Sequence, residues 1–379
     1  MKNYAKILFF IVFLVMLYQV FVFNSSTLLD RHLKDFSANY RIYSLQLPDE
    51  MHFAGEQVPL QNSDVWERFD REMLVNIYWQ SNTLLVIKRA NRWFPLIEKI
   101  LSEQGIPDDF KYIAMIESAF QNVTSPSGAQ GFWQFLDETA KKYNLEVNEY
   151  VDERYHVEKA TIAACNYFKE AYSYFNNWTL VAASYNMGIG GVNTQIKRQK
   201  VSSFYDLFLN IETSRYIFRI LAAKEIYENQ EKYGFYVLKR HLYKPLKTYE
   251  RIVDTTIANL TDFAIQNQVT YRTLKLYNPW LRTTELPNKD RKVYRILLPE
   301  QSVEDDMSDE VLIDEEVIEK APVPEPSEIK VVNHTVIKNE KLNDIALKYK
   351  VSVDDLKKWN NLSTEKLKKG QVLQVLIYN

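Results

Sequence analysis

One carboxylate, that of Glu117, occupies a position in the sequence where acid–base chemistry is possible. It ends a predicted helix that opens at Pro107 with two acidic residues, as the helix dipole favours. Phe110, Ile113 and Ala114 form the apolar stripe of this helix, and the helical period places Glu117 on the same face. Burial raises the pKa of a carboxyl group, so Glu117 could stay protonated near neutral pH and donate a proton.

A glutamate at a helix end is, by itself, more often solvated or paired with a cation. Three further segments follow it in the chain. Residues 125–135 contain two glycines three apart, which allow close backbone approach, and aromatic and amide groups that suit a sugar face. Residues 182–188 end an apolar helix, and residues 212–216 begin another. Each segment alone is typical of packing or capping, so their joint occurrence carries the argument.

Together and in this order, the segments resemble the motifs of the family 1 lytic transglycosylases, glycoside hydrolase family 23. The motifs are Glu-Ser at 117–118, Gly-x-x-Gly-x-Trp-Gln at 128–134, Ala-x-Tyr-Asn-x-Gly at 183–188 and Glu-Thr-x-x-Tyr at 212–216. The resemblance extends from near Val58 to near Tyr227 and implies a lysozyme-like fold. It implies Glu117 as the acid/base catalyst, and as substrate-binding or supporting residues it implies Ser118, Ser125, Gln134, Tyr185, Asn186, Glu212 and Tyr216.

The resemblance also implies a reaction. The family cleaves the β-1,4 bond between N-acetylmuramic acid and N-acetylglucosamine in peptidoglycan and closes a 1,6-anhydro ring without consuming water. A two-carboxylate glycosidase requires a second Asp or Glu across the scissile bond, and the matching motifs offer no obvious candidate for that position. Two alternatives stay open. A goose-type muramidase would hydrolyse the same bond, and a non-catalytic tether would only bind peptidoglycan strands.

Composition excludes several other functions. The net charge of −2 and the pI near 6.3 give no basic field that would attract nucleic acid. The single cysteine, Cys165, excludes an internal disulfide framework, and the five histidines show no metal-ligand spacing. We therefore expect no metal and no cofactor.

The N-terminus predicts contact with a membrane. Lys2 and Lys6 precede an apolar run from Ile7 to Phe23, which as a helix would extend roughly 25 Å, at the short end for a bilayer. The preceding positive charges place the N-terminus in the cytoplasm and the body outside it. We expect an anchor in the inner membrane of a bacterial envelope with the body in the periplasm, or a periplasmic protein if the segment is cleaved.

An internal repeat ends the chain. When the sequence is shifted by 82 residues, Leu260 to Ala264 fall on Leu342 to Ala346, and Asn278 falls on Asn360. Both copies predict a βααβ order, and the second resembles the LysM module, which binds N-acetylglucosamine-containing glycans between two loops. That resemblance implies glycan contacts at Glu340, Leu342, Asn361 and Leu362. The first copy is degenerate, so a structural role is as compatible with it as binding.

The expected fold class is α+β and multidomain, with a mainly α lysozyme-like domain followed by two small βααβ units. Helical periodicity dominates from about residue 60 to about residue 240. The expected parts are a signal anchor (1–24), a polar connecting segment (25–58), the catalytic domain (59–245), a degenerate LysM-like unit (249–299), an acidic Pro-containing linker (300–330) and a LysM domain (331–379).

Overall fold

The computed structural model describes residues 42–300 and 329–378, apart from residues 339, 350, 361 and 363. The chain divides into two compact units, residues 1–302 and residues 303–379. The predicted anchor at 1–24 and nearly all of the predicted linker at 300–330 lie outside the described residues. Within the described part of the chain, no helix is both long and apolar enough to cross a membrane.

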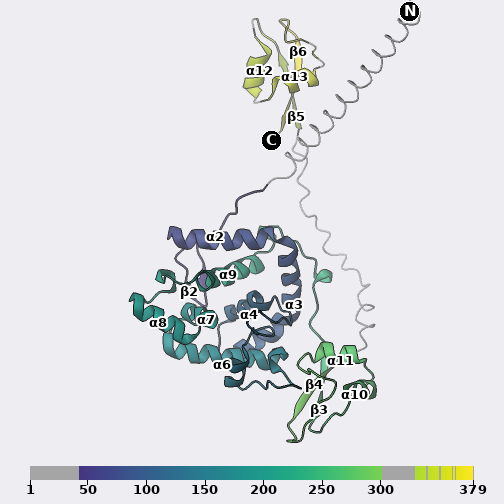
Figure 1. Cartoon of the computed structure of the whole chain (residues 1–379). Coiled ribbons are helices and arrows are strands. Elements are labelled where there is room, and N and C mark those ends of the chain that lie inside the picture. The colour runs from purple at the N-terminus through teal and green to yellow at the C-terminus, as the bar shows by residue number, and fades with distance from the viewer. Residues whose placement is uncertain are drawn as a thin grey trace, which may run out of the picture. The chain divides into compact units, whose positions relative to one another are not determined.

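Among the described residues of the first unit, a short hairpin that the sequence did not predict precedes a helical body (Figure 1). The hairpin strands are β1 (His52–Phe53) and β2 (Glu56–Gln57). The α-helices are α2 (Ser63–Tyr78), α3 (Gln80–Glu103), α4 (Lys111–Ser118), α5 (Asp137–Lys142), α6 (Val157–Phe175), α7 (Trp178–Met187), α8 (Ile189–Gln199) and α9 (Ile211–Glu228). Short 3-10 turns are η1 (Asp108–Phe110), η2 (Glu153–Tyr155), η3 (Phe204–Asp206), η4 (Glu231–Tyr233) and η5 (Lys239–His241).

Asparagines fix the helix ends that matter for the later motifs. Asn176 ends α6 in the left-handed conformation (φ 47°), and the side chain of Asn177 accepts a hydrogen bond from the N–H of Leu180 to begin α7. Asn210 caps α9 in the same way, through the N–H of Thr213. The first N–H groups of a helix have no partner within the helix, and each cap supplies one. The asparagines therefore determine where α7 and α9 start.

The short helix α4 lies inside the helical body and packs against α3 and α9 (Figure 1). Ile113 and Ala114 of α4, and Phe110 of the preceding 3-10 turn η1, are fully buried, as the predicted apolar stripe required. Aromatic contacts surround α4: the ring of Phe94 on α3 meets Tyr112 edge to face at 5.7 Å between centroids. A helix of eight residues is marginal alone, so this packing is what stabilises it.

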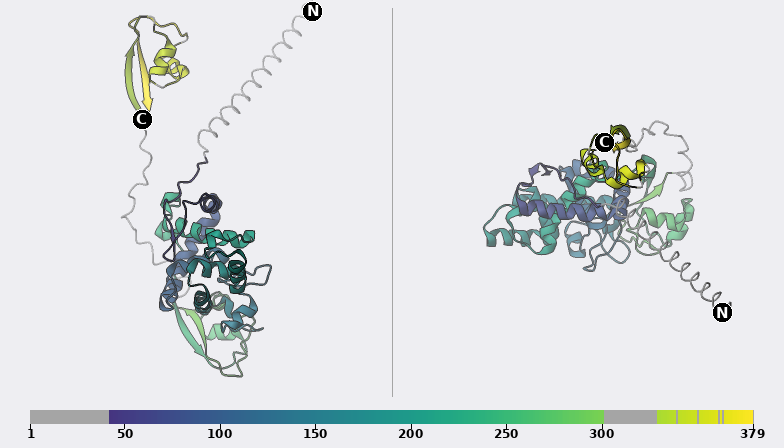
Figure 2. Two further views of the ribbon diagram at one scale, coloured as in Figure 1. Left: turned by 90° about the vertical axis from the view of Figure 1, so that its left-hand side faces the viewer. Right: turned by 90° about the horizontal axis from the view of Figure 1, so that it is seen from above.

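Residues 248–299 form the first βααβ unit, here called the docked unit, and confirm the predicted element order. Its elements are β3 (Thr248–Val253), α10 (Leu260–Gln266), α11 (Tyr271–Tyr277) and β4 (Tyr294–Pro299). The two strands pair antiparallel with Thr248 opposite Pro299. Figure 2 shows this unit at one end of the helical body. Its core includes Val151 and Tyr155 of the helical body, so the two parts share buried surface.

Residues 329–378 form the C-terminal unit, which repeats the βααβ order. Its elements are β5 (Ile329–Thr335), α12 (Leu342–Tyr349), α13 (Val353–Trp359) and β6 (Val372–Tyr378), with β5 and β6 antiparallel. It has its own core, which includes Leu342, Ile345 and Leu356. A core within the unit is what independent folding requires.

One asparagine closes each βααβ unit in the same way. Asn278 Nδ2 donates to Leu297 O (2.7 Å), and Leu297 N donates to Asn278 Oδ1 (2.8 Å). In the C-terminal unit, Asn360 makes the corresponding pair of hydrogen bonds with the backbone of Gln374, at 2.8 and 2.7 Å. The two asparagines are those that the 82-residue shift aligned. The repeat is therefore present in the structure as well as in the sequence.

Candidate active site

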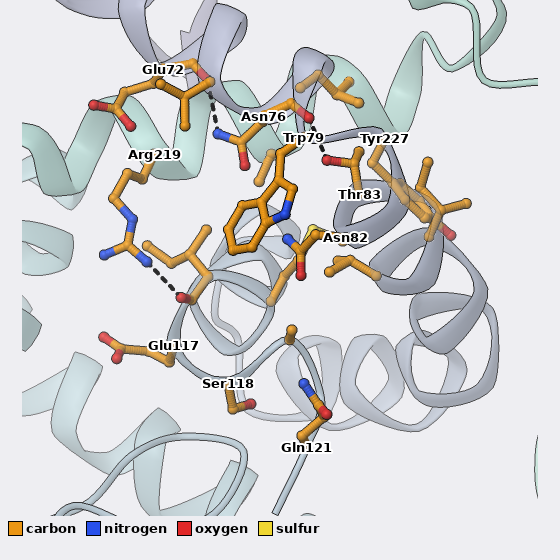
Figure 3. A pocket seen from close by; sticks show the side chains of 18 of the residues that line it. Glu72, Asn76, Trp79, Asn82, Thr83, Glu117, Ser118, Gln121, Arg219 and Tyr227 are labelled. Carbon is orange, nitrogen blue, oxygen red and sulfur yellow. Dashed lines mark hydrogen bonds between the residues drawn. The ribbon is translucent and has the colours of Figure 1, made fainter. Parts of the chain in front are cut away.

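Glu117 lies in the last turn of α4 and lines a cavity of about 530 Å³ (Figure 3). The helix ends abruptly because Ala119 (φ 50°) and Phe120 (φ 55°) both adopt the left-handed conformation. Two consecutive non-glycine residues in this region cost free energy, and such strain is concentrated at functional sites. The turn removes the chain from in front of Glu117, so its half-buried carboxyl group stays accessible from the cavity.

Opposing influences act on the Glu117 carboxyl. Burial raises its pKa most strongly, and the nearby carboxylate of Glu212 adds to the rise. A hydrogen bond from Tyr216, whose hydroxyl donates to Glu117 Oε1 at 2.5 Å, and the positive charge of Arg219 both favour the ionised form. The net effect is a raised pKa. A carboxyl group in such surroundings can both give and take a proton near neutral pH.

Arg219 is held in place by the helix that carries Glu117. Its Nη2 donates to Ile116 O at 2.8 Å (Figure 3). The guanidinium therefore stabilises the C-terminal end of α4, where the helix dipole is negative, and lies close to the carboxylate. This places a fixed positive charge beside Glu117.

Ser118 connects α4 to the Gly-x-x-Gly-x-Trp-Gln loop. Its Oγ donates to Phe132 O at 2.9 Å and lies 3.3 Å from Ala114 O, and the side chain is buried. The loop closes on itself through Ser125, whose Oγ accepts from the N–H of Ala129 at 3.0 Å. Gln134 adds two more contacts, since its Nε2 donates to Gly131 O at 2.8 Å and to a second loop carbonyl. These polar groups build the loop.

Of the two glycines in that loop, only Gly131 permits a close backbone approach. A Cβ at Gly131 would lie 1.9 Å from the carbonyl oxygen of Arg154, whereas a Cβ at Gly128 would meet nothing within 4 Å. Gly128 is needed instead for its left-handed backbone, with φ 80°. Arg154 is itself buried and paired with Asp152, with Nη2 to Oδ2 at 2.8 Å.

The third and fourth motifs meet each other across α7 and α9. Asn186 Nδ2 donates to Glu212 Oε1 at 3.0 Å, and Thr213 Oγ1 donates to Asn186 Oδ1 at 2.7 Å. Tyr185 instead points toward the loop, where its hydroxyl donates to Trp133 O at 2.7 Å. The motifs therefore form one hydrogen-bonded assembly around the end of α4.

The predicted site residues divide by position. Glu117, Ser118 and Glu212 line the cavity. The others contact these residues or the loop, through the hydrogen bonds given above, and they are Ser125, Gln134, Tyr185, Asn186 and Tyr216. None of these five side chains lines the cavity in this structure.

Sequence reasoning missed a group of lining residues from α2 and α9. Arg215 Nε lies 2.7 Å from Glu72 Oε1, and Arg71 contacts the same buried carboxylate at 2.5 Å. Two guanidinium groups thus compensate the charge of Glu72. Arg215 lies within the fourth motif and Arg219 follows it four positions later, at helical spacing, which was a signal. Glu72 gave no signal, because it lies 143 positions away from Arg215.

The residues predicted to contact glycan in the C-terminal unit differ in how exposed their side chains are. Glu340 Oε2 lies 3.0 Å from His334 Nε2 and accepts from the N–H of Ile337, so its carboxylate is used inside the unit. Leu342 is buried at 1% exposure in the core, and its side chain has no surface for a sugar. Leu362 is partly buried against that core. Asn361 lies outside the described residues.

Three parts of the chain match known protein families. Residues 95–208 match the transglycosylase SLT domain. The chain carries an SLT domain. Behind it, residues 249–302 match the soluble lytic transglycosylase C-terminal LysM-like domain, and residues 334–375 match the LysM domain. The SLT match contains Glu117 and the second and third motifs, while Glu212 and Tyr216 follow its end.

A curated relative matches over most of the chain. The membrane-bound lytic murein transglycosylase D of Escherichia coli is 26% identical over 334 residues, covering 85% of this chain and 72% of that protein. Two solved structures match a smaller part. The 70 kDa soluble lytic transglycosylase of Escherichia coli is 23% identical with a TM-score of 0.31, and a lytic transglycosylase Slt of Pseudomonas aeruginosa is 20% identical with a TM-score of 0.29. Each of the two matches covers 40% of this chain and 26% of the solved chain with which it is compared.

Proposed function

We propose that the chain is a peptidoglycan lytic transglycosylase that cleaves the β-1,4 bond between N-acetylmuramic acid and N-acetylglucosamine and leaves 1,6-anhydromuramoyl ends. The observation that carries this proposal is the half-buried carboxyl group of Glu117, which lies within the matched SLT domain, has a raised pKa and lines the cavity. The LysM-type units behind it fit a polymeric glycan as substrate.

The proposed mechanism uses Glu117 twice. Protonated Glu117 gives its proton to the glycosidic oxygen, and the bond to the muramoyl C1 breaks. The resulting carboxylate takes the proton of the muramoyl C6 hydroxyl, whose oxygen bonds to C1 and closes the ring. The proton returns to Glu117, and no water is consumed. Tyr216 and Arg219 support the step in which Glu117 is ionised, because both stabilise its charge.

Glu212 is the observation that favours the alternative, hydrolysis by a goose-type muramidase. Its exposed carboxylate lines the same cavity as Glu117. A second carboxylate could activate water, as in inverting glycosidases. Its hydrogen bond from Asn186 and the bridge to Thr213 instead give it a supporting place between α7 and α9.

Digestion of purified sacculi distinguishes these reactions. Wild-type protein should release muropeptides that are lighter by one water than the reducing-end products of a muramidase, as mass spectrometry can measure. Glu117→Gln is nearly isosteric but cannot cycle a proton, so it should keep the fold and lose at least about a hundredfold in rate. Reducing-end products would refute the transglycosylase proposal, and E117Q activity within tenfold of wild type would refute the role of Glu117.

We also propose that residues 1–24 anchor the chain in the inner membrane, with the body in the periplasm. The apolar run behind two lysines supports this, and the similar protein from Escherichia coli is named membrane-bound. Full-length chain should sediment with membranes and resist extraction by salt, whereas chain lacking residues 1–24 should not. Equal release of both by salt would contradict the anchor.

A further inference from the structure

Trp79 occupies a rigid corner between α2 and α3. Its N–H donates to Val75 O as the last bond of α2, and its carbonyl accepts from the N–H groups of Asn82 and Thr83 in the first turn of α3. Thr83 Oγ1 also donates to Asn76 O at 2.5 Å, which ties the two helices together. The position of the Trp79 backbone is therefore set by the fold, without any ligand.

The side chain of Trp79 is unusually accessible for an indole. It is 60% exposed, whereas Trp133 is fully buried and Trp280 is 2% exposed. Figure 3 shows the ring directed into the cavity that Glu117 also lines. An exposed aromatic ring in the same cavity as Glu117 leaves apolar surface in water unless a ligand covers it.

Two amide side chains line the same cavity and have donors and acceptors available for a ligand. Asn82 comes from α3 and Gln121 from the segment after α4, and both line the cavity with Trp79. Within residues 42–300, neither side-chain amide is engaged with another residue. The exposed side chain of Val75 widens the apolar surface next to the indole. An aromatic face flanked by donors and acceptors is the composition of a ligand pocket.

This combination suits an N-acetylhexosamine ring. The C–H groups on one face of such a sugar are apolar and can pack on an indole, while its hydroxyl and acetamido groups at the ring edge need donors and acceptors. The charged cavity residues lie on α2, α4 and α9: Glu72 pairs with Arg215, and Arg219 and Glu212 act on Glu117. The cavity residues Trp79, Val75, Asn82 and Gln121 carry no charge. A neutral sugar is therefore a better occupant than a charged peptide.

We propose that Trp79, Asn82 and Gln121 form a saccharide subsite, which holds a sugar of the glycan strand beyond the two that flank the scissile bond. The inference rests on the proposed function, since the strand reaches this subsite only when another part of it lies at Glu117. Trp79 and Asn82 precede residues 95–208 and Gln121 lies within them, so the subsite combines the corner between α2 and α3 with the matched SLT domain. Trp79 is thus a determinant of strand binding.

The test is steady-state kinetics of the full-length chain on soluble glycan strands of increasing length, without peptide stems. Trp79→Ala should raise KM about tenfold for long strands, the loss expected for one well-packed aromatic contact, with a smaller change in kcat. The rise should be least for the shortest strand that is cleaved. Gln121→Ala, on a different segment, should raise KM in the same length-dependent way. Trp66→Ala is the matched control, because Trp66 is also an exposed tryptophan on α2, at 43%, but does not line the cavity.

Each outcome decides between the proposals. A KM for W79A equal to wild type at every strand length would overturn the subsite, as would a fall in kcat with no change in KM. Release of reducing-end products by wild type would refute the proposed reaction alone, because the comparison of KM values remains valid whichever way the bond is cut. Wild-type protein that cuts no strand would refute both.

Discussion

The Glu117 carboxyl group has to be an acid and then a base within one catalytic cycle, and its surroundings favour neither form completely. Burial favours the protonated form, whereas the Tyr216 hydroxyl and the Arg219 guanidinium favour the ionised form. Tyr216 is itself buried, and its pKa is raised well above 10, so its hydroxyl stays a donor over the working range of pH. Balance between these influences sets the pH at which both steps are possible.

Tyr216→Phe tests this balance through the pH profile. Loss of the hydrogen bond removes an influence that lowers the pKa of Glu117, so the pKa rises and the alkaline limb of kcat/KM should move to higher pH. Tyr112→Phe is the control. Tyr112 lies on α4, as Glu117 does, but its hydroxyl donates to Glu228. An unchanged limb in Y216F, or an equal shift in Y112F, would contradict the assignment.

The same raised pKa has a consequence for stability. The folded protein holds the Glu117 proton more tightly than the unfolded chain, so this contribution is complete below the unfolded pKa of about 4.3 and is lost as pH rises through the folded pKa. Glu117→Gln cannot ionise. Its Tm relative to wild type should therefore increase with pH in thermal melts, and a difference that does not depend on pH would count against a raised pKa.

Gly131 and Gly128 provide a matched pair. Gly131→Ala places a methyl group against the carbonyl of Arg154 as well as in a left-handed conformation, and should cost roughly 3 kcal/mol of unfolding free energy. Gly128→Ala meets open space and should cost only about 1 kcal/mol, from the backbone alone. Urea denaturation measures both. Equal losses would mean that the loop moves away from Arg154 at little cost.

At the scale of elements, the docked unit differs from its repeat by a longer final loop. Asn278 and its strand partner Leu297 are 19 positions apart, whereas Asn360 and Gln374 are 14 apart. The longer loop carries Trp280, which lies against His156 of the helical body, and Leu281, which pairs with Val151. The insertion is therefore part of the contact with the helical body.

Trp280→Ala should reveal this contact as a structural one. Trp280 is buried, and its loss should destabilise the first unit by about 3–5 kcal/mol. Residues 152–156 follow Val151 directly and include Arg154, whose carbonyl contacts the catalytic loop at Gly131, so turnover should fall as well. Leu276→Ala, at an exposed position of α11, should stay within about 0.5 kcal/mol in chemical denaturation. A stable and fully active W280A would mean that docking is unimportant.

The sequence predicted the elements that have strong local signals. The apolar stripe ending at Glu117 and the βααβ order of both repeats were readable, because periodicity is a local property. The hairpin β1–β2 was missed because strands of two residues are too short to alternate. The corner at Trp79 was missed because no glycine or proline marks it. Arg219 and Glu72 could not be placed without the fold, since their contacts with α4 and Arg215 are long-range.

At the level of the whole molecule, we expect the C-terminal unit to increase affinity for polymeric glycan without changing the catalytic rate. All four motifs precede residue 217, and the unit has its own core. Removal of residues 331–379 should therefore weaken binding to intact sacculi in sedimentation assays and leave turnover of short soluble glycans nearly unchanged, because a short substrate cannot reach two sites. Equal loss on long and short substrates would refute this tethering role.

The paired asparagines also mark where amide hydrogen exchange should differ between the repeats. The N–H of Leu297 and that of Gln374 each donate to an asparagine side chain, so each exchanges only when its own βααβ unit opens. In the docked unit, opening also exposes the buried surface shared with Val151 and Tyr155. In the C-terminal unit, opening breaks only the small core around Leu342 and Leu356. The protection of Leu297 should therefore follow the global unfolding of residues 42–300, while Gln374 should exchange much sooner, through an opening that leaves the enzyme folded.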